Sequence, residues 1–366
     1  MIRGLLRTAR YARSWGGRAR VTTHETAIER GGARLPATLI LPAVGRGPHP
    51  GWIVLGGVTR MGRFHPQLVR FAEALASSGA AVLVPEVPEW RDLRIVPSVA
   101  APTLRAGIRA LRGRREVRPG KVGVVGLSFG AAQVALASTQ EDLAADIAGI
   151  ALFGGYFDLE RTLRCMITGV HEWKGERHRL IPDPYGRWVV AANHLTLVPG
   201  YEDAGDVADA LRRLALAATE KRIPAWLPEH DALKNELRPC IAECRRHVFD
   251  FFAPLTDAPQ PCCEEGDVWA ARLAEACRNA DPLLEPAGRI DRVRAPTRLI
   301  HGRNDRLVPY TESLRFAEAI PPGVDVRVTV TGLFAHSANL APPSLADRAR
   351  EGVRLFEAIR GLINVV

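Results

Sequence analysis

Short apolar runs alternate with segments of helical periodicity along most of the sequence, and this alternation constrains the fold more than any other feature. Residues 65–79, for example, place Leu68, Phe71 and Leu75 at helical spacing and lie between two buried runs. Parallel strands need long crossover connections, which are usually helices. The pattern therefore predicts an α/β fold, with a mostly parallel central sheet flanked by helices on both faces. The predicted strands are THETAIER (23–30), LPATLILPA (35–43), GWIVLGG (51–57), AAVLVPEV (80–87), KVGVVGL (121–127), IAGIALFGG (147–155), TRLIHG (297–302) and DVRVTVTG (325–332).

The alternation stops near Asp158 and resumes at residues 295–302. Residues 159–285, which lie between, read mainly as helices, such as DVADALRRLALAATEKR and DVWAARLAEACRN, separated by loops that contain proline. We therefore expect a core built from residues 1–158 and 286–366, and a helical cap or lid inserted at residues 159–285.

Residues 1–20 predict a basic amphipathic helix. Ile2, Leu5, Leu6, Ala9 and Ala12 recur at helical spacing, and the arginines between them point elsewhere. Such a helix either docks on its own domain or lies on an anionic membrane. Docking is the favoured expectation, and weak peripheral membrane contact is the alternative. The segment lacks the continuous apolar core of a signal peptide.

The composition argues against several classes of protein. The 49 basic and 40 acidic residues are interspersed, so the net charge of +9 forms no long basic run and predicts no nucleic-acid partner. Six cysteines without a CxxC pair are too few for a disulfide scaffold. They indicate buried free thiols in a reducing compartment, hence a cytoplasmic location, rather than a metal site. No run of 18 apolar residues predicts a transmembrane helix.

The motif GLSFG follows a predicted strand and opens a predicted helix. In that context Gly126 and Gly130 allow a turn so sharp that the hydroxyl of Ser128 stands clear of the sheet, a geometry termed a nucleophile elbow. The helix that follows favours negative charge beside the serine, and the amide of Phe129 is placed to donate one bond to an oxyanion. The alternative is a tight turn that merely needs glycine.

A serine nucleophile needs a histidine base held by a carboxylate. Asp305 follows the strand 297–302, and His336 follows the strand 325–332. Parallel strands present their carboxyl ends at one edge of a sheet, so we expect Ser128, Asp305 and His336 to meet there. Asp158, after the strand 147–155, is the second candidate for the acid.

These three spaced motifs, in the order Ser, Asp, His, resemble the α/β-hydrolase superfamily, in particular its serine esterases and lipases with a helical lid. The resemblance implies that Ser128 is the nucleophile, His336 the general base and then acid, and Asp305 the group that orients the imidazole. It also implies a second oxyanion donor in the loop after the strand 51–57, where the amide of Val58 is the candidate. Gly56 stands where the family commonly has a histidine, so a side chain that braces this loop is absent.

The sequence thus predicts a serine esterase that cleaves a small, fairly apolar carboxylic ester through an acyl-enzyme, with no metal or organic cofactor. An acyltransferase and a hydrolase of small peptides or amides would use the same triad and stay open as alternatives. A noncatalytic binding module of the same fold is a further alternative, which the replacement of the usual histidine by Gly56 favours. The loop GGVTRMGR lacks the Lys-Ser/Thr pair of a phosphate-binding loop, and no GxGxxG follows the first strand of the parallel series, so no nucleotide is expected.

Overall fold

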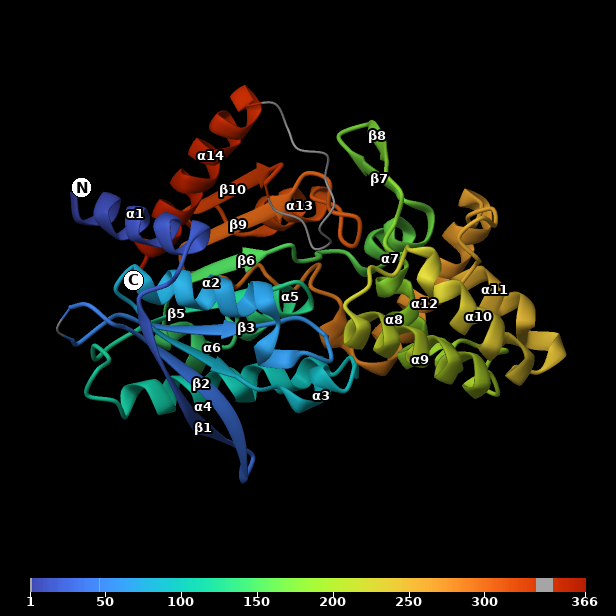
Figure 1. Cartoon of the computed structure of the whole chain (residues 1–366), viewed down its shortest axis with the longest axis horizontal. Coiled ribbons are helices and arrows are strands. Elements are labelled where there is room, and N and C mark those ends of the chain that lie inside the picture. The colour runs from blue at the N-terminus through green and yellow to red at the C-terminus, as the bar shows by residue number, and fades with distance from the viewer. Residues whose placement is uncertain (1, 46, 334–344) are drawn as a thin grey trace.

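An eight-stranded sheet forms the centre of the protein in the computed structural model, which describes residues 2–45, 47–333 and 345–366. The strand order is β1-β2-β4-β3-β5-β6-β9-β10 (Figure 1). The β1–β2 and β2–β4 pairs are antiparallel, and every other pair in the sheet is parallel. The mostly parallel sheet that the sequence predicts is therefore confirmed. The strands are β1 (Val21–Arg30), β2 (Ala33–Pro42), β3 (Gly51–Leu55), β4 (Ala81–Pro85), β5 (Val122–Leu127), β6 (Ile147–Phe153), β9 (Thr297–Gly302) and β10 (Val326–Thr331).

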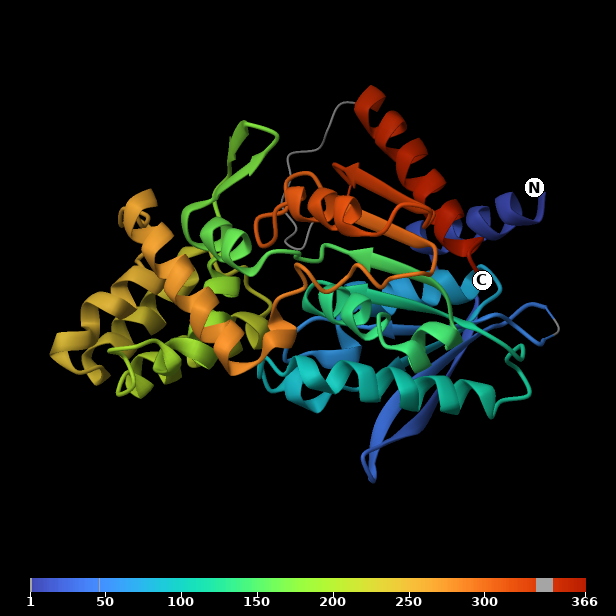
Figure 2. The same ribbon diagram turned by 180° about the vertical axis from the view of Figure 1, so that it is seen from behind.

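Helices cover both faces of the sheet because the side chains of the buried strands alternate between two apolar layers. Trp52 and Val54 of β3 pack with α1, α2 and α14, while Ile53 and Leu55 pack with α4, α5 and α13. The two layers are visible from opposite sides in Figures 1 and 2. The helices of this part are α1 (Ile2–Gly16), α2 (Pro66–Ser77), α3 (Pro88–Arg91), α4 (Ala100–Arg112), α5 (Phe129–Ala137), α6 (Glu141–Asp146), α13 (Thr311–Ala319) and α14 (Leu345–Ile363).

Residues 159–285, which we name the helical segment, contribute no strand to the large sheet. They form a group of helices at the carboxyl ends of the parallel strands (Figure 1) and have an apolar core of their own around Trp188, Phe252 and Leu273. The sequence reading of this segment as mainly helical is right but incomplete, because an antiparallel hairpin lies within it. Its elements are α7 (Leu159–Thr168), β7 (Val170–Trp173), β8 (Glu176–Arg179), α8 (Pro184–His194), α9 (Gly205–Lys221), α10 (Asp231–Leu237), α11 (Arg246–Phe252) and α12 (Cys263–Ala280).

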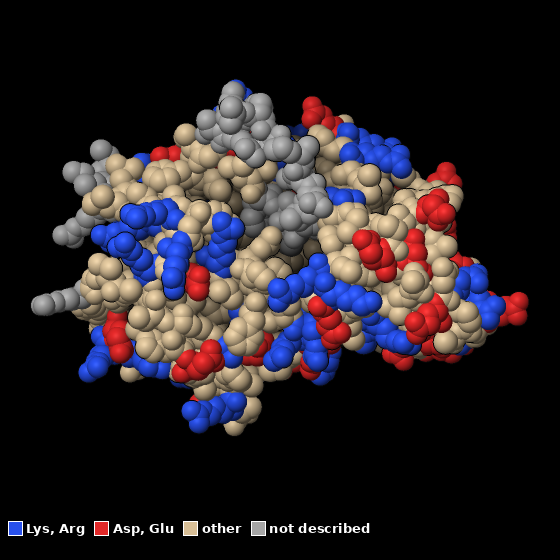
Figure 3. Space-filling model, viewed as in Figure 1, with Lys and Arg blue, Asp and Glu red and all other residues tan. Residues whose placement is uncertain are grey.

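The N-terminal helix docks on the core, but four of the apolar positions that the sequence singles out, Leu5, Leu6, Ala9 and Ala12, are exposed. Tyr11 is 6% exposed and packs edge-on against Phe71 of α2, and the ring of Trp15 stacks beside it. Leu5 and Leu6 remain 39% and 55% exposed. Small residues and one aromatic ring make the docked face, because α1 lies close against α2 and α14. Figure 3 shows basic side chains gathered over the left part of the view, near α1.

Two further sequence expectations can be compared with the described residues. No helix among them is both long enough and apolar enough to span a bilayer. The six cysteines are unpaired, but the expectation that they are buried is wrong for most of them: only Cys165 and Cys277 are buried, Cys263 is partly exposed, and Cys240, Cys244 and Cys262 are exposed.

The centre of the sheet depends on a missing side chain. Trp52 is fully buried and lies opposite Gly123 in the β3–β5 pair. A Cβ atom on Gly123 would lie 2.3 Å from the indole ring, so only glycine lets the ring lie flat on β5. This close contact fixes the spacing of the strand that leads into Ser128.

We expect Gly123→Ala to lower the free energy of unfolding by about 1–3 kcal/mol, the usual cost of overpacking a dense core. Chemical denaturation followed by tryptophan fluorescence measures the change. Gly113→Ala is the matched control, because Gly113 has a φ of −75° and an added Cβ would meet nothing closer than 3.7 Å. Equal stability of the two variants would contradict the role given to Gly123.

Candidate active site

Ser128 occupies a strained turn between β5 and α5. Its φ of 56° and ψ of −127° lie outside the regions that a residue with a side chain prefers. The Ser128 amide donates to the carbonyl of Phe153 at the end of β6 (2.8 Å), and the Ser128 carbonyl accepts from the amide of Ala131 (2.9 Å). Strain of this kind costs about 1–3 kcal/mol and persists only where neighbouring structure enforces it.

Three glycines allow other segments of backbone to approach this turn. A Cβ on Gly126 would lie 2.4 Å from the carbonyl oxygen of Gly130, and one on Gly130 would lie 2.2 Å from that of Gly56. A Cβ on Gly57 would lie 2.9 Å from the Cβ of Ser128. The loop after β3 therefore passes directly beside the serine. An oxyanion donor at Val58, which the sequence predicts, needs this loop to lie there.

Two cavities meet at Ser128. The larger one, of about 490 Å³, lies between the loop after β3 and the end of α9, and Ile223, Trp226 and Leu307 line it. The smaller one, of about 90 Å³, is almost wholly apolar and lies between Phe129 and helices α7 and α8. Four residues line both cavities: Val58, Ser128, Tyr185 and Leu307. The serine is thus open to space on two sides, with the helical segment forming one wall of each cavity.

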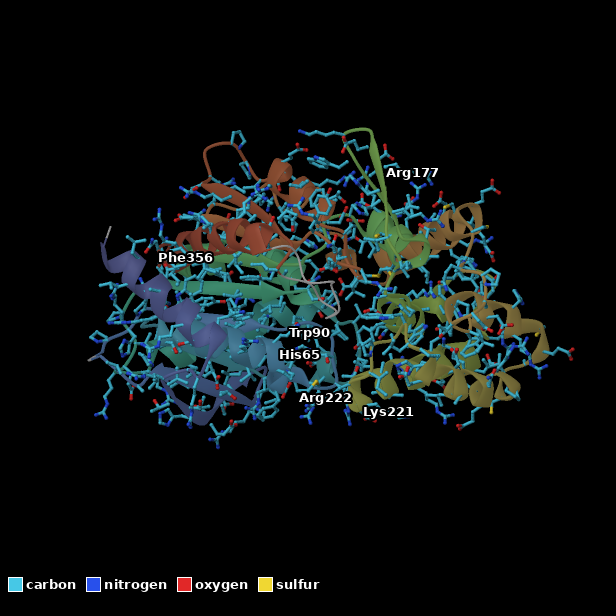
Figure 4. The ribbon with its side chains drawn as sticks, turned by 45° about the horizontal axis from the view of Figure 1, so that its top comes forward. His65, Trp90, Arg177, Lys221, Arg222 and Phe356 are labelled. Atoms are coloured by element: carbon cyan, nitrogen blue, oxygen red, sulfur yellow. The ribbon has the colours of Figure 1, made fainter. Side chains whose placement is uncertain are left out.

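Figure 4 shows two side chains of the larger cavity, His65 from the core and Arg222 from the end of α9. His65 stands at the N-cap position of α2, but its side chain makes no capping hydrogen bond. His65 therefore lines the cavity and does not cap the helix through its side chain.

Asp305 lies in the loop after β9 and is only 1% exposed. Its Oδ1 accepts from the amides of Leu307 (2.9 Å) and Val308 (3.1 Å), which fixes the carboxylate in the loop. Because Leu307 lines both cavities, this loop reaches the space beside Ser128. β10 ends at Thr331 beside Gly302 of β9, so the chain leaves toward residue 336 from the same edge of the sheet. His336 itself lies outside the described residues.

Two neighbouring groups have structural roles. His301 is completely buried, with Nδ1 2.7 Å from Ser313 Oγ and Nε2 2.9 Å from the carbonyl of Val308. Asp158, the second candidate for the catalytic acid, caps α7: its Oδ1 accepts from the Arg161 amide (2.8 Å) and its Oδ2 from the Arg161 guanidinium (2.9 Å). Neither Asp158 nor Asp305 lines a cavity at Ser128. Because both oxygens of Asp158 are engaged by Arg161 at the start of α7, we favour Asp305 as the acid.

Tyr185, at the start of α8, is the site residue that sequence reasoning missed. Its hydroxyl donates to the carbonyl of Val58 (3.1 Å) and lies 3.4 Å from Thr219 Oγ1. Burial raises the pKa of Tyr185 to about 12, so the hydroxyl keeps its proton. The letters DPYG at 183–186 predict the start of a helix, because an Asp cap is followed by a Pro. They do not predict that Tyr185 contacts Val58, which lies 127 residues earlier in the chain.

Comparison with solved structures identifies the fold. The chain aligns with an orthorhombic crystal form of Pyrococcus horikoshii acylaminoacyl peptidase at a TM-score of 0.51 and 14% identity, over 93% of this chain and 41% of that chain. It aligns with a bacterial brefeldin A esterase, a homologue of human hormone sensitive lipase, at a TM-score of 0.50 and 17% identity, over 94% and 78%. The chain has the α/β-hydrolase fold.

At these identities the likeness shows the fold alone, and the chain spans about two fifths of the length of the peptidase. No protein-family model matches the sequence, and no curated protein matches it. Among the described residues, no group of three or more His, Cys, Asp or Glu side chains could hold a metal ion.

Glu312 joins α13 to the loop after β6. Its Oε2 accepts from the amides of Phe157 (3.1 Å) and Asp158 (2.8 Å), and Arg315 lies 3.6 Å from its other oxygen. The carboxyl group is completely buried, and this burial raises its pKa from 4.5 to about 7 against the opposing effect of the amides and Arg315. Between these two pH values the folded protein holds a proton that the unfolded chain has released.

We therefore expect the contribution of Glu312 to stability to be greatest below pH 4.5 and to be lost as the pH rises through 7. The full effect is about 3 kcal/mol. Urea denaturation of the wild type and of Glu312→Gln, at intervals from pH 5 to 8, gives the difference in unfolding free energy. The wild type should lose stability relative to the variant as the pH rises. A difference that does not change with pH would contradict the shifted pKa.

Proposed function

We propose that the protein is a serine hydrolase that cleaves a carboxylic ester through an acyl-enzyme. The observation that carries the proposal is the strained backbone of Ser128, placed between a buried strand and a helix N-terminus and open to two cavities. Strain at a cavity is typical of a reacting group, whereas a purely structural turn could place glycine at this position. The α/β-hydrolase fold is consistent with this chemistry.

In the proposed reaction Ser128 Oγ attacks the ester carbonyl while His336 takes its proton. The amides of Val58 and Phe129 donate to the oxyanion, and the start of α5 adds a favourable dipole. His336 then protonates the leaving alkoxide and activates the water that releases the acid. Asp305, fixed by two backbone amides, would orient the imidazole and stabilise its charged form.

The unequal cavities suggest the shape of the ester. The smaller cavity, of about 90 Å³ and walled by Leu163, Met166 and Val190, fits a short apolar group. The larger, of about 490 Å³, has room for a bulkier arm and opens past Arg222. An uncharged ester with one short apolar side and one larger side fits both, and the helical segment would act as the cap that selects it.

We further propose that Tyr185 positions the oxyanion loop. Gly56 and Gly57 carry no side chain that could hold this loop, and the Tyr185 hydroxyl bonds the carbonyl of Val58 from the opposite wall. Fixing this carbonyl limits rotation of the Val58 backbone, whose own amide is the proposed oxyanion donor. The tyrosine would thereby replace the bracing side chain that Gly56 lacks.

We expect Ser128→Ala to lower turnover of p-nitrophenyl esters by at least about 10⁴-fold and to abolish labelling by a fluorophosphonate. Ser138→Ala, at the end of the same helix, is the control: among the described residues its hydroxyl bonds only the Val134 carbonyl. Undiminished hydrolysis by Ser128→Ala would refute the mechanism. Parallel assays with aminoacyl anilides and with competing alcohols separate an esterase from an amidase and an acyltransferase.

We expect Tyr185→Phe to lower kcat about tenfold, the value of one hydrogen bond at the upper end of its usual range, and to leave KM within about twofold. Loss of a whole oxyanion donor would cost about 100- to 1,000-fold. Tyr201→Phe, a second tyrosine of the helical segment, packs on Trp269 and lines neither cavity, so its kinetics should match the wild type. A rise in KM alone would assign Tyr185 to substrate binding instead.

A further inference from the structure

A third cavity, of about 510 Å³, lies outside the candidate active site, between the β7–β8 hairpin and the loop that carries Asp305. Its wall contains three arginines, and no Asp or Glu is among the described residues that line it. Figure 3 shows basic side chains over the hairpin, in the upper right part of the view. The lining residues are His171, His178, Arg179, Leu180, Ile181, Arg303, Asn304, Arg306 and Tyr310.

One arginine of this cavity is held in place without a carboxylate. Arg306 Nε donates to the carbonyl of Ile181 (2.7 Å), and its guanidinium stacks 4.2 Å from the centre of the Trp226 ring. Asp183 is near enough to favour its charge, but no ion pair of Arg306 occurs within the described part of the chain. The remaining N–H groups of this half-buried guanidinium are therefore available to a ligand in the cavity.

The other two arginines come from opposite sides. Arg179 ends β8, where its backbone pairs with that of Val170; its side chain is exposed and makes no ion pair or hydrogen bond to any residue that the structure describes. Arg303 begins the Asp305 loop and lies 3.6 Å from Glu351, a carboxylate that does not line the cavity. Three further carboxylates lie near the wall without lining it: Glu176, 3.9 Å from His178 and 82% exposed, Asp183, which favours the charge of Arg306, and the buried Asp305. The cavity thus holds an excess of positive charge.

The ring system beside these arginines agrees with an electropositive environment. His171 and His178 stack with their ring centres 5.0 Å apart, and Tyr310 packs against both. Burial, together with the charges of His178, Arg315 and His301, lowers the pKa of His171 to about 4. Positive side chains that line the same cavity without paired carboxylates repel one another, and a bound anion removes that repulsion.

We propose that this cavity binds a phosphate group, either free or carried on a small molecule, between Arg179 of the hairpin and Arg303 and Arg306 of the Asp305 loop. Planar guanidinium groups bond two oxygens of a phosphate at once, which favours this ligand over a monovalent ion. Asn304 and Tyr310 add neutral donors. A bound phosphate bridges two segments that lie about 120 residues apart in the sequence and so stiffens the loop that fixes Asp305.

Isothermal titration calorimetry of the full chain, at constant ionic strength, tests this site with inorganic phosphate, glycerol 3-phosphate and citrate. We expect saturable binding of at least one phosphate compound with a dissociation constant below about 1 mM. Arg179→Gln, which alters an exposed side chain, should weaken it at least about tenfold. Arg177→Gln is the control, because Arg177 lies on the same strand but contacts Cys263 and does not line the cavity. Figure 4 shows Arg177 on the hairpin.

Tighter binding of glycerol 3-phosphate than of inorganic phosphate identifies a phosphorylated small molecule as the ligand, and equal binding identifies the free ion. Hydrogen exchange at residues 303–310 should slow when the site is saturated. The proposal is overturned if no phosphate compound saturates, if citrate alone binds, if Arg179→Gln binds as well as Arg177→Gln, or if exchange in the loop does not change. None of these outcomes depends on the activity of Ser128.

Discussion

The close approach of three backbone segments around Ser128 is the constraint on which the rest of the structure depends. The end of β5, the first turn of α5 and the loop after β3 come so near that Gly126 and Gly130 have no room for a Cβ atom, and Gly57 has little. The cost of the positive φ at Ser128 is met by the packing of strands and helices on both sides. The buried sheet thus holds a single hydroxyl in a conformation that it would not adopt in a free chain.

Most of the core could be predicted from the sequence because its signals are local. Buried parallel strands read as short apolar runs, and the glycines around Ser128 follow from the turn that they allow. The β7–β8 hairpin could not be read in this way. Its strands, VHEW and ERHR, carry charged or polar residues on both faces, so neither shows the alternation of a half-buried strand. The one local sign is the turn at Lys174 and Gly175, which both have a positive φ.

The candidate site was predictable only in part, for a related reason. Ser128 and Asp305 follow strands, and a sheet brings the ends of its strands together whatever the details of packing. Tyr185 reaches the oxyanion loop from a helix outside the sheet, and that contact depends on how the helical segment packs on the core. The face on which α1 docks is a similar case: Leu5 and Leu6 form the stronger apolar pattern, yet Tyr11 makes the contact, because close helix packing selects shape as well as hydrophobicity.

The first turn of α8 joins two loops of the candidate site. The Asp183 amide donates to the carbonyl of Arg306 (2.8 Å), next to Asp305, and the Tyr185 hydroxyl donates to the carbonyl of Val58 (3.1 Å). The Asp183 carboxylate, in turn, accepts from the Tyr185 amide (3.0 Å) and caps the helix. Three consecutive residues therefore hold the Asp305 loop with one bond and the loop after β3 with another. Since both bonds start from one rigid turn, a movement of α8 shifts the Asp305 carboxylate and the proposed oxyanion donor together. The helical segment is thus part of the geometry on which the proposed catalysis would depend.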